Sequence, residues 1–175
     1  MFNNLFNKST INEFYNKYNK EFKIQNKEKE AINDWNKKLI ADELVKERAN
    51  YTNFANLILN KLLGFGYDDF KQDETIKGNF ADFIIFKDEK PYIVIELKGS
   101  KKDLDKKVDG ENAVDQGFRY AKSYETVEWI MVSNYDEFRL YNKKTDEKYV
   151  SFKFEELTSY NEDTIQFLTA LPSNL

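Results

Sequence analysis

Residues 79–98, NFADFIIFKDEKPYIVIELK, contain two apolar runs on either side of the polar stretch Asp88–Pro91. Asp and Pro are common in turns, and the apolar runs are short and rich in Ile, Val and Phe. The pattern predicts two strands, at 80–87 and 92–98, that form an antiparallel hairpin. This hairpin is expected to form the centre of the fold.

The apolar pattern also predicts the register of this hairpin. If the turn centres on Glu89, paired positions sum to 178, and Asp82 then lies opposite Glu96. The same register gives two further pairs: Ile84 with Val94, and Phe86 with Tyr92. The second face holds only apolar residues: Ala81, Phe83, Ile85, Ile93, Ile95 and Leu97. Both faces are therefore expected to be buried, with two facing carboxylates at one end.

Facing carboxylates are unfavourable unless a positive charge lies between them. Facing Cβ atoms are about 5 Å apart, and two negative charges at that distance repel by about 3 kcal/mol at an effective dielectric constant of about 20. Lys98 lies about 6.6 Å along the strand from Glu96, too far to neutralise both acids. A divalent cation between Asp82 and Glu96 is the economical solution. The alternative is that Asp82 and Glu96 are solvated residues at strand ends and that Lys98 is an ordinary surface lysine.

The composition limits the chemistry that this chain can perform. It has 175 residues, no Cys and no His, which excludes disulfides, thiolate chemistry, histidine bases and histidine-rich zinc sites. Catalysis would use carboxylates, lysines and a hard cation, chiefly magnesium or manganese. The formal net charge of -4 argues that any DNA contact is local. Because no stretch resembles a membrane span or a secretory signal, we expect a cytoplasmic protein without membrane contact.

Helical and strand patterns follow one another along the chain. Two or three helices are expected in residues 1–50, where Thr10 and Glu13 resemble a capping box, and a later helical pattern stops at Gly64 and Gly66. Six strands and one helix are then predicted: strands at 68–72, 80–87, 92–98, 128–133, 137–142 and 147–153, and a helix at 111–125. The chain returns to a helical pattern past Phe154 and stops after Pro172.

The order of these elements predicts an α/β fold. A strand, helix and strand crossover makes the sheet mixed, and we expect a central sheet of four or five strands with helices on both faces. In the N-terminal part, five apolar residues recur at helical spacing: Ile32, Trp35, Leu39, Ile40 and Leu44. A helix continued through this region would place Glu43 and Glu47 one turn apart on one face.

Several of these features resemble a known family. Asp82, followed fourteen positions later by Glu96-Leu97-Lys98 at the end of an apolar strand, resembles the PD-(D/E)XK nuclease motif, although Ala81 stands where the proline often lies. Other segments resemble, in the right order, elements of the N-terminal endonuclease domains of type IIG and type I restriction enzymes: Glu47-Arg48 before an apolar helix, Gln116 to Ala121, 129–134 and 137–141. The resemblance covers about residues 43–142 and implies a restriction-endonuclease-like fold.

The resemblance implies a domain organisation and partners. Residues 43–154 would form the nuclease core, 1–42 a helical N-terminal extension, and 155–175 a C-terminal helical segment leading to a following domain. The implied partners are double-stranded DNA and linked or associated methyltransferase and target-recognition domains, with S-adenosylmethionine bound only in the methyltransferase. The isolated domain is expected to be monomeric and to assemble on DNA to cut both strands.

The resemblance also implies roles for individual residues. Magnesium, or manganese in its place, would be bound by Asp82, Glu96, the Leu97 carbonyl and a helix acid, which is Glu47 or Glu43. Lys98 would orient or deprotonate the attacking water, and Gln116 would position water or a phosphate oxygen. The products would carry a 5′-phosphate and a 3′-hydroxyl. Five residues are expected near the DNA: Lys101, Lys102, Lys106, Lys107 and Tyr120.

Each of these elements also has a purely structural explanation. The helix acids could be solvated, Gln116 and Tyr120 could pair on a helix surface, and the lysines could belong to a solvated loop. Three other functions stay open. They are a catalytically inactive nuclease fold that serves as a DNA-binding or assembly module, the nuclease domain of a type I restriction subunit, and an RNA-directed or repair nuclease.

Overall fold

The computed structural model describes residues 24–76, 79–145 and 149–159. The helices are α2 (Asn26–Ile40), the 3-10 helix η1 (Arg48–Asn50), α3 (Tyr51–Asn53), the π-helix η2 (Phe54–Leu62), α4 (Ala113–Ala121) and α5 (Phe154–Leu157). The strands are β1 (Phe70–Ile76), β2 (Asn79–Lys87), β3 (Lys90–Leu97), β4 (Trp129–Ser133), β5 (Glu137–Asn142) and β6 (Tyr149–Lys153). The predicted capping box at Thr10 and Glu13 and the helix end after Pro172 lie outside the described residues.

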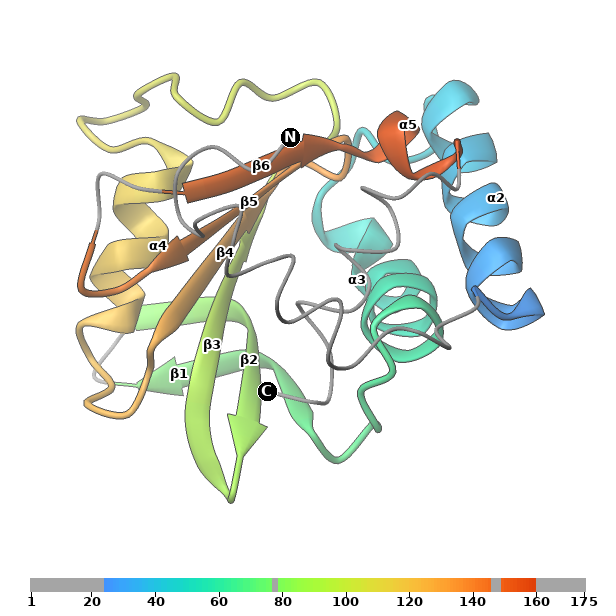
Figure 1. The fold of residues 1–175 in the computed structure, drawn as a ribbon. Coiled ribbons are helices and arrows are strands. Elements are labelled where there is room, and N and C mark those ends of the chain that lie inside the picture. The colour runs from blue at the N-terminus through green and yellow to red at the C-terminus, as the bar shows by residue number, and fades with distance from the viewer. Residues whose placement is uncertain (1–23, 77–78, 146–148, 160–175) are drawn as a thin grey trace.

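A six-stranded sheet in the order β1-β2-β3-β4-β5-β6 forms the centre of the molecule (Figure 1). Only β3 and β4 are parallel, and α4 makes the crossover between them. The prediction of an α/β fold with a mixed sheet is confirmed. The prediction of four or five strands was wrong, because β1 and β6 both pair with their neighbours and extend the sheet at its two edges.

The central hairpin follows the predicted register over its apolar part. Ile84 pairs with Val94, but the predicted pair of Phe86 with Tyr92 was wrong, since Phe86 pairs with Pro91. Asp88 and Glu89 have φ of 50° and 62°, which forms a tight two-residue turn. Next to the turn, Phe86 pairs with Pro91, which is shifted by one residue from the register of Ile85 with Ile93 in the apolar run. Tyr92 is the extra residue, and it absorbs the difference as a bulge.

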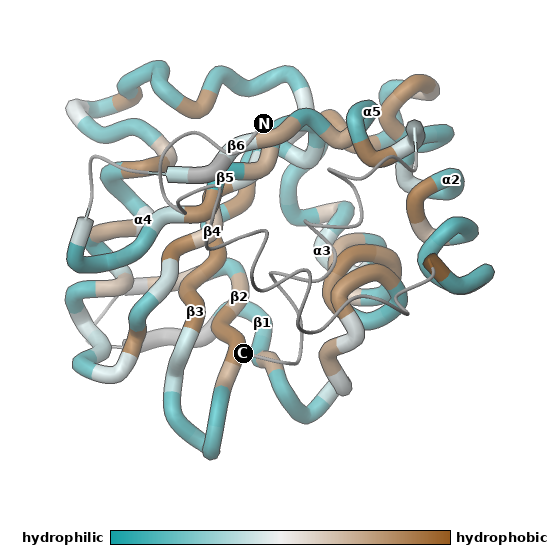
Figure 2. The backbone as a smooth tube through the Cα atoms, viewed as in Figure 1, coloured by the Kyte–Doolittle hydropathy of each residue, from teal (hydrophilic) through white to brown (hydrophobic). Residues whose placement is uncertain are grey.

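Helices cover both faces of the sheet, and each face has its own apolar cluster. On one face α2, η2 and α5 pack around the aromatic side chains of Trp35, Phe54 and Phe138. On the other face α4 packs on Ile84 of β2, on Val94 of β3 and on the apolar residues of β4. Figure 2 shows hydrophobic residues concentrated in the central strands and in the helix that follows α3, which is η2. The described part of the chain contains no helix long and apolar enough to cross a membrane.

Strand β2 is irregular at Asp82. The pairing of β1 with β2 passes from Gln72/Phe83 to Glu74/Ala81, with no pair recorded at Asp73 and Asp82, and Asp73 has a φ of 51°. Ala81 was predicted to share a face with Phe83, which was wrong, because it packs in the cluster under α4. The alternation of faces is therefore broken at the position of the aspartate.

The helix predicted through Glu43 and Glu47 was also wrong. Helix α2 ends at Ile40, which is 78% exposed, and Asp42 takes a left-handed φ of 57°. The chain then continues through turns to Glu47, the residue that precedes η1. The two acids consequently do not share a helix face.

Candidate active site

Asp82 and Glu96 are the two buried carboxylates of the central hairpin, 9% and 3% exposed. Both oxygens of Asp82 accept hydrogen bonds: Oδ1 from the Tyr51 hydroxyl and Oδ2 from the backbone N–H of Leu97, the latter at 2.6 Å. Phe83 pairs with Ile95, so Asp82 and Glu96 are the next positions along the two strands. The predicted carboxylate pair therefore lies at the carboxyl end of β3.

Glu96 has one oxygen with a partner and one without. Its Oε1 accepts a hydrogen bond from the Lys98 ammonium group, as expected for residues two apart on one strand face. Its Oε2 is buried and has no hydrogen-bond partner among the described residues. A buried carboxylate oxygen left unpaired is costly. A positively charged group beside this oxygen would compensate its burial.

Glu47 reaches the same site from a different part of the chain. Its Oε2 lies 3.8 Å from the Lys98 Nζ, and its Oε1 lies 3.4 Å from the Tyr51 hydroxyl. Glu43, the other candidate, is exposed and pairs with Lys38 at 2.9 Å. The structure thus brings Glu47 to the site and leaves Glu43 on the surface.

A glycine two residues beyond β3, Gly99, allows Glu47 to come this close. A Cβ on Gly99 would lie 1.9 Å from the Val45 carbonyl oxygen, so only a glycine permits this backbone contact. The Ser100 N–H also donates to the Leu44 carbonyl at 3.0 Å. The segment before Glu47 is therefore held directly against the residues that follow Lys98.

Burial and mutual repulsion raise the pKa values of the acids. Burial, followed by the negative charge of Asp82, raises the pKa of Glu96 to about 8, although Lys98 opposes the rise. Burial likewise raises the pKa of Asp82 to about 6, against the hydrogen bonds from Tyr51 and Leu97. Burial on its own would lower the pKa of Lys98, but the neighbouring carboxylates, Glu96 first, raise it overall. Three carboxylates facing one ammonium group leave a formal charge of -2 when all are ionised.

Helix α4 packs closely on the strand that carries Glu96. A Cβ on Gly117 would lie 2.8 Å from Ile130 Cγ2 and 3.7 Å from Glu96 Cβ. Gln116, the preceding residue, is half-buried. Tyr120 is also half-buried, and its pKa is raised by burial and then by the negative charge of Glu96. The structure therefore places the helix predicted to support the site directly over it.

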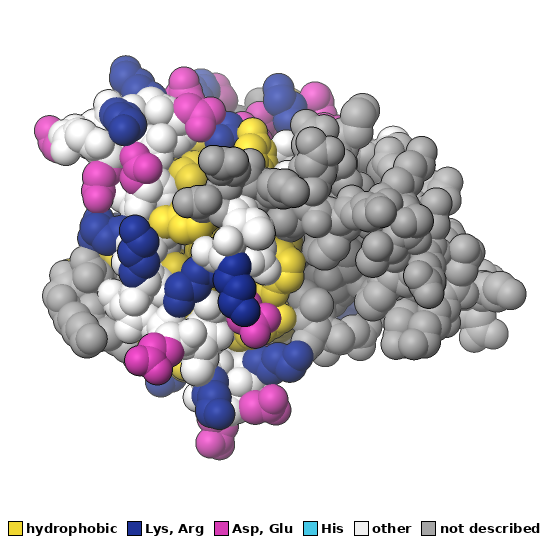
Figure 3. Space-filling view, turned by 60° about the vertical axis from the view of Figure 1, so that its left-hand side comes forward, with side chains coloured by type: hydrophobic (Ala, Val, Ile, Leu, Met, Phe, Trp, Pro, Cys, Tyr) yellow, Lys and Arg dark blue, Asp and Glu magenta, His cyan; other side chains and the backbone are white. Residues whose placement is uncertain are grey.

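The loop after β3 carries the four predicted DNA-contacting lysines. Lys101 pairs with Asp42 at 2.6 Å, and Lys107 with Asp115 at 3.7 Å. The side chains of Lys101, Lys102, Lys106 and Lys107 are all exposed. Figure 3 shows basic and acidic side chains side by side on one face of the molecule. The lysines are thus available to solvent, but two of them are partly compensated by carboxylates.

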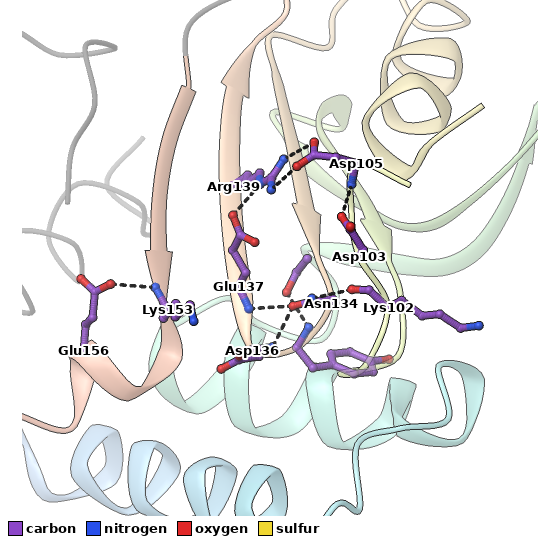
Figure 4. Close-up of polar contacts among 11 residues, drawn as sticks. Lys102, Asp103, Asp105, Asn134, Asp136, Glu137, Arg139, Lys153 and Glu156 are labelled. Carbon is purple, nitrogen blue, oxygen red and sulfur yellow. Dashed lines mark hydrogen bonds and ion pairs between the residues drawn. The ribbon is translucent and has the colours of Figure 1, made fainter. Parts of the chain in front are cut away.

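The same loop is anchored to β5 and to the turn before it by contacts that the sequence did not predict (Figure 4). The buried guanidinium of Arg139 donates to both oxygens of Asp105, at 2.7 and 2.9 Å, and to Glu137 at 2.6 Å. Asn134 Nδ2 donates to the Lys102 carbonyl at 2.7 Å. Tyr51 is a further residue of the site that the sequence reasoning missed. Its only sequence signal is its position one helical turn after Glu47.

Comparison with known proteins identifies the family. A family model described as the N-terminal domain of MmeI matches residues 21–173. The chain belongs to the MmeI N-terminal domain family. MmeI is a type IIG restriction enzyme, so the resemblance to type IIG enzymes seen in the motifs is confirmed. The searches of curated proteins and of solved structures gave no match.

The donor set in this member of the MmeI N-terminal domain family consists of oxygen atoms. Among the described residues, no three or more Asp, Glu, His or Cys side chains are grouped closely enough to hold a metal ion by themselves. Magnesium usually binds proteins through one or two carboxylates, with water and substrate phosphates as its other ligands. Asp82 and Glu96 supply two carboxylates, and Glu96 Oε2 has no other partner in the described chain. The residues present fit a hard divalent cation.

Proposed function

We propose that this chain is the DNA-cleaving domain of a restriction-modification enzyme, and that it hydrolyses phosphodiester bonds of double-stranded DNA with magnesium, or manganese in its place. The observation that carries the proposal is the convergence of Asp82, Glu96 and Lys98 at the end of β3, with a buried carboxylate oxygen that has no partner in the described chain. Membership of the MmeI N-terminal domain family supports it, since this family implies a restriction-modification enzyme.

The site is of the PD-(D/E)XK type in this proposal. Asp82, Glu96 and the Leu97 carbonyl would hold the cation, with Glu47 reaching it from the segment before η1. When bound, the cation would lower the pKa of a water molecule and offset the charge that builds up on the phosphate. The ionised carboxylates give the site an excess negative charge, which favours a cation there. The cation would compete with the proton that the raised pKa of Glu96 favours, and it would stabilise the ionised form of Glu96.

Lys98 and α4 would act on the water and the phosphate. The carboxylates around Lys98 raise its pKa, so it stays an ammonium group in neutral solution. It can then donate hydrogen bonds to the attacking water and to the phosphate oxygens as they gain charge. Gln116 would position water or a phosphate oxygen from the helix above Glu96. Cleavage would leave a 5′-phosphate and a 3′-hydroxyl.

DNA binding would be local and shared with other parts of the enzyme. The exposed lysines after β3 and Tyr120 would contact the phosphate backbone near the site. Site selection would come from linked or associated target-recognition and methyltransferase domains, the latter with S-adenosylmethionine. A second enzyme molecule assembled on the DNA would cut the other strand.

The test is cleavage of plasmid DNA by the full-length enzyme and its variants. Asp82→Ala, Glu96→Ala and Lys98→Ala should each abolish cutting, and methylation, where the enzyme has it, should persist and report a folded protein. Glu47→Ala should cut far more slowly, whereas the matched control Glu43→Ala should cut normally. Retained cutting by Glu96→Ala would overturn the assignment of this site.

Calorimetry separates this proposal from the inactive-module alternative. The chain is titrated with magnesium or manganese in the absence of DNA. An active site of the proposed kind should bind the cation, and Glu96→Ala should weaken that binding. An inactive nuclease fold that serves only in DNA binding or assembly should show no binding.

A further inference from the structure

Tyr51 is a buried residue in contact with two acids of the site. It is 2% exposed, and its hydroxyl donates to Asp82 Oδ1 and lies 3.4 Å from Glu47 Oε1. A phenol has one proton to donate, and the close contact with Asp82 shows which carboxylate receives it. Burial, and then the charge of Asp82, raise the pKa of Tyr51 above its ordinary range, so the hydroxyl remains a donor.

Packing holds the Tyr51 ring in place. Its ring centroid lies 5.4 Å from that of Phe83 in an edge-to-face contact, within the apolar cluster under α2 and η2. Phe83 is the neighbour of Asp82 in β2 and pairs with Ile95 of β3. The hydroxyl is therefore fixed relative to the hairpin that carries both buried carboxylates.

The Asp82 carboxylate is held on both of its oxygens. Two donors contact it, one on each oxygen: the Tyr51 hydroxyl and the Leu97 N–H. A carboxylate has about four lone-pair positions, so two contacts fix its plane and still leave acceptor capacity on both oxygens.

We propose that Tyr51 is a positioning residue for the cation site, and that its hydroxyl fixes the Asp82 carboxylate in the orientation that binds the divalent cation. The proposal rests on the proposed function, because it assigns a role to a residue beside the same site. Tyr51 does not touch the cation or the DNA in this scheme. Its effect is to prevent the carboxylate from rotating away from Glu96 when the site is empty, which lowers the cost of ordering the site on binding.

The test uses Tyr51→Phe, which removes one oxygen atom and keeps the ring that packs on Phe83. Manganese binding to the chain is measured by isothermal titration calorimetry without DNA, and unfolding in EDTA reports whether the variant is folded. Loss of a group that orients a metal ligand typically weakens metal binding about 10- to 100-fold. We expect a loss in that range, and cleavage by the full-length variant should recover as the manganese concentration is raised. The matched control is Tyr67→Phe, which loses a hydroxyl that bonds to Asn56 and should bind manganese as the wild type does.

The outcomes distinguish this inference from the proposed function. If the wild-type chain binds no manganese, the proposed function fails. If the wild type binds manganese and Tyr51→Phe binds it equally well, only the positioning role fails. If Tyr51→Phe is unfolded, the wild-type chain is titrated with magnesium instead. The NMR signal of the Tyr51 ring carbon that is bonded to oxygen is then monitored during the titration. That signal should shift with the midpoint found by calorimetry, and a signal that does not move would overturn the inference.

Discussion

Replacing Glu96 by glutamine is expected to stabilise the metal-free chain at alkaline pH, although the same change should abolish cleavage. Burial raises the pKa of Glu96 from an ordinary 4.5 to about 8. Between these values the folded state holds more protons than the unfolded state, so the free energy of unfolding falls as the pH rises through this interval. A tenfold change in proton affinity corresponds to about 1.4 kcal/mol, and the complete change from 4.5 to about 8 therefore corresponds to about 5 kcal/mol.

The contact of Glu96 with Lys98 is already part of this value, because Lys98 lowers the pKa of Glu96 from a still higher value. In the glutamine variant, Lys98 keeps Glu47 at 3.8 Å and its side chain is 24% exposed, so it remains partly compensated. We therefore expect Glu96→Gln to be more stable than the wild type by up to about 5 kcal/mol at pH 9 and nearly equal to it at pH 5.

The assay is urea unfolding of the chain in EDTA at pH 5, 7 and 9. The wild type should lose stability along this series, and Glu96→Gln should lose less. The matched control is Glu43→Gln, whose side chain is 55% exposed and which should stay within about 0.5 kcal/mol of the wild type at every pH. If Glu96→Gln and the wild type have the same pH dependence, the burial and raised pKa of Glu96 are refuted.

Three further predictions concern the surroundings of the site. Gly99→Ala should destabilise the chain and abolish cleavage, because the new Cβ would lie 1.9 Å from the Val45 carbonyl oxygen. A variant that unfolds and cuts DNA as the wild type does would contradict this prediction. Arg139→Leu should cost about 1 to 3 kcal/mol and weaken DNA binding without slowing cleavage at saturating DNA. Hydrogen exchange should show the loop around Asp105 opening in this variant, and unchanged protection there would count against the anchor. The isolated chain should bind duplexes weakly at physiological salt and without sequence preference, as measured by fluorescence anisotropy, because its net charge is -4. Tight, selective binding would show that recognition is built into this domain.

The apolar pattern predicted the central hairpin well. Strands that are buried on both faces leave little choice of register, since a slip by one residue would move the charges into the apolar faces. The pairs from Phe83/Ile95 to Ile85/Ile93 follow that register, whereas the turn region departs from it at Tyr92. The departure arises because a tight turn has its own geometry, which local hydrophobicity does not encode.

Helical periodicity was a poorer guide between α2 and η1. The spacing of Leu39, Ile40 and Leu44 suggested that one helix continues to Glu47, but Ile40 is exposed and the chain turns at Asp42. A left-handed aspartate is not distinguishable from a helical one by sequence pattern. The choice between Glu43 and Glu47 therefore could not be made before the tertiary structure was known.

The sequence by itself determined the chemistry open to this protein and the residues at its centre. The absence of His and Cys restricted any catalysis to carboxylates, lysines and oxygen-bound cations, and two apolar strands marked Asp82, Glu96 and Lys98 as candidate site residues. These conclusions depend on composition and on neighbours along one hairpin, which the chain order fixes directly.

Only the tertiary structure decided which distant residues lie beside the candidate site. Glu47 is held near Lys98 by the backbone contact at Gly99. Tyr51 donates a hydrogen bond to Asp82, which lies 31 positions later in the sequence. Arg139 likewise anchors a loop 34 positions away. Contacts of this kind depend on how helices and loops pack on the sheet, and packing is set by the shape of the whole core rather than by any local pattern.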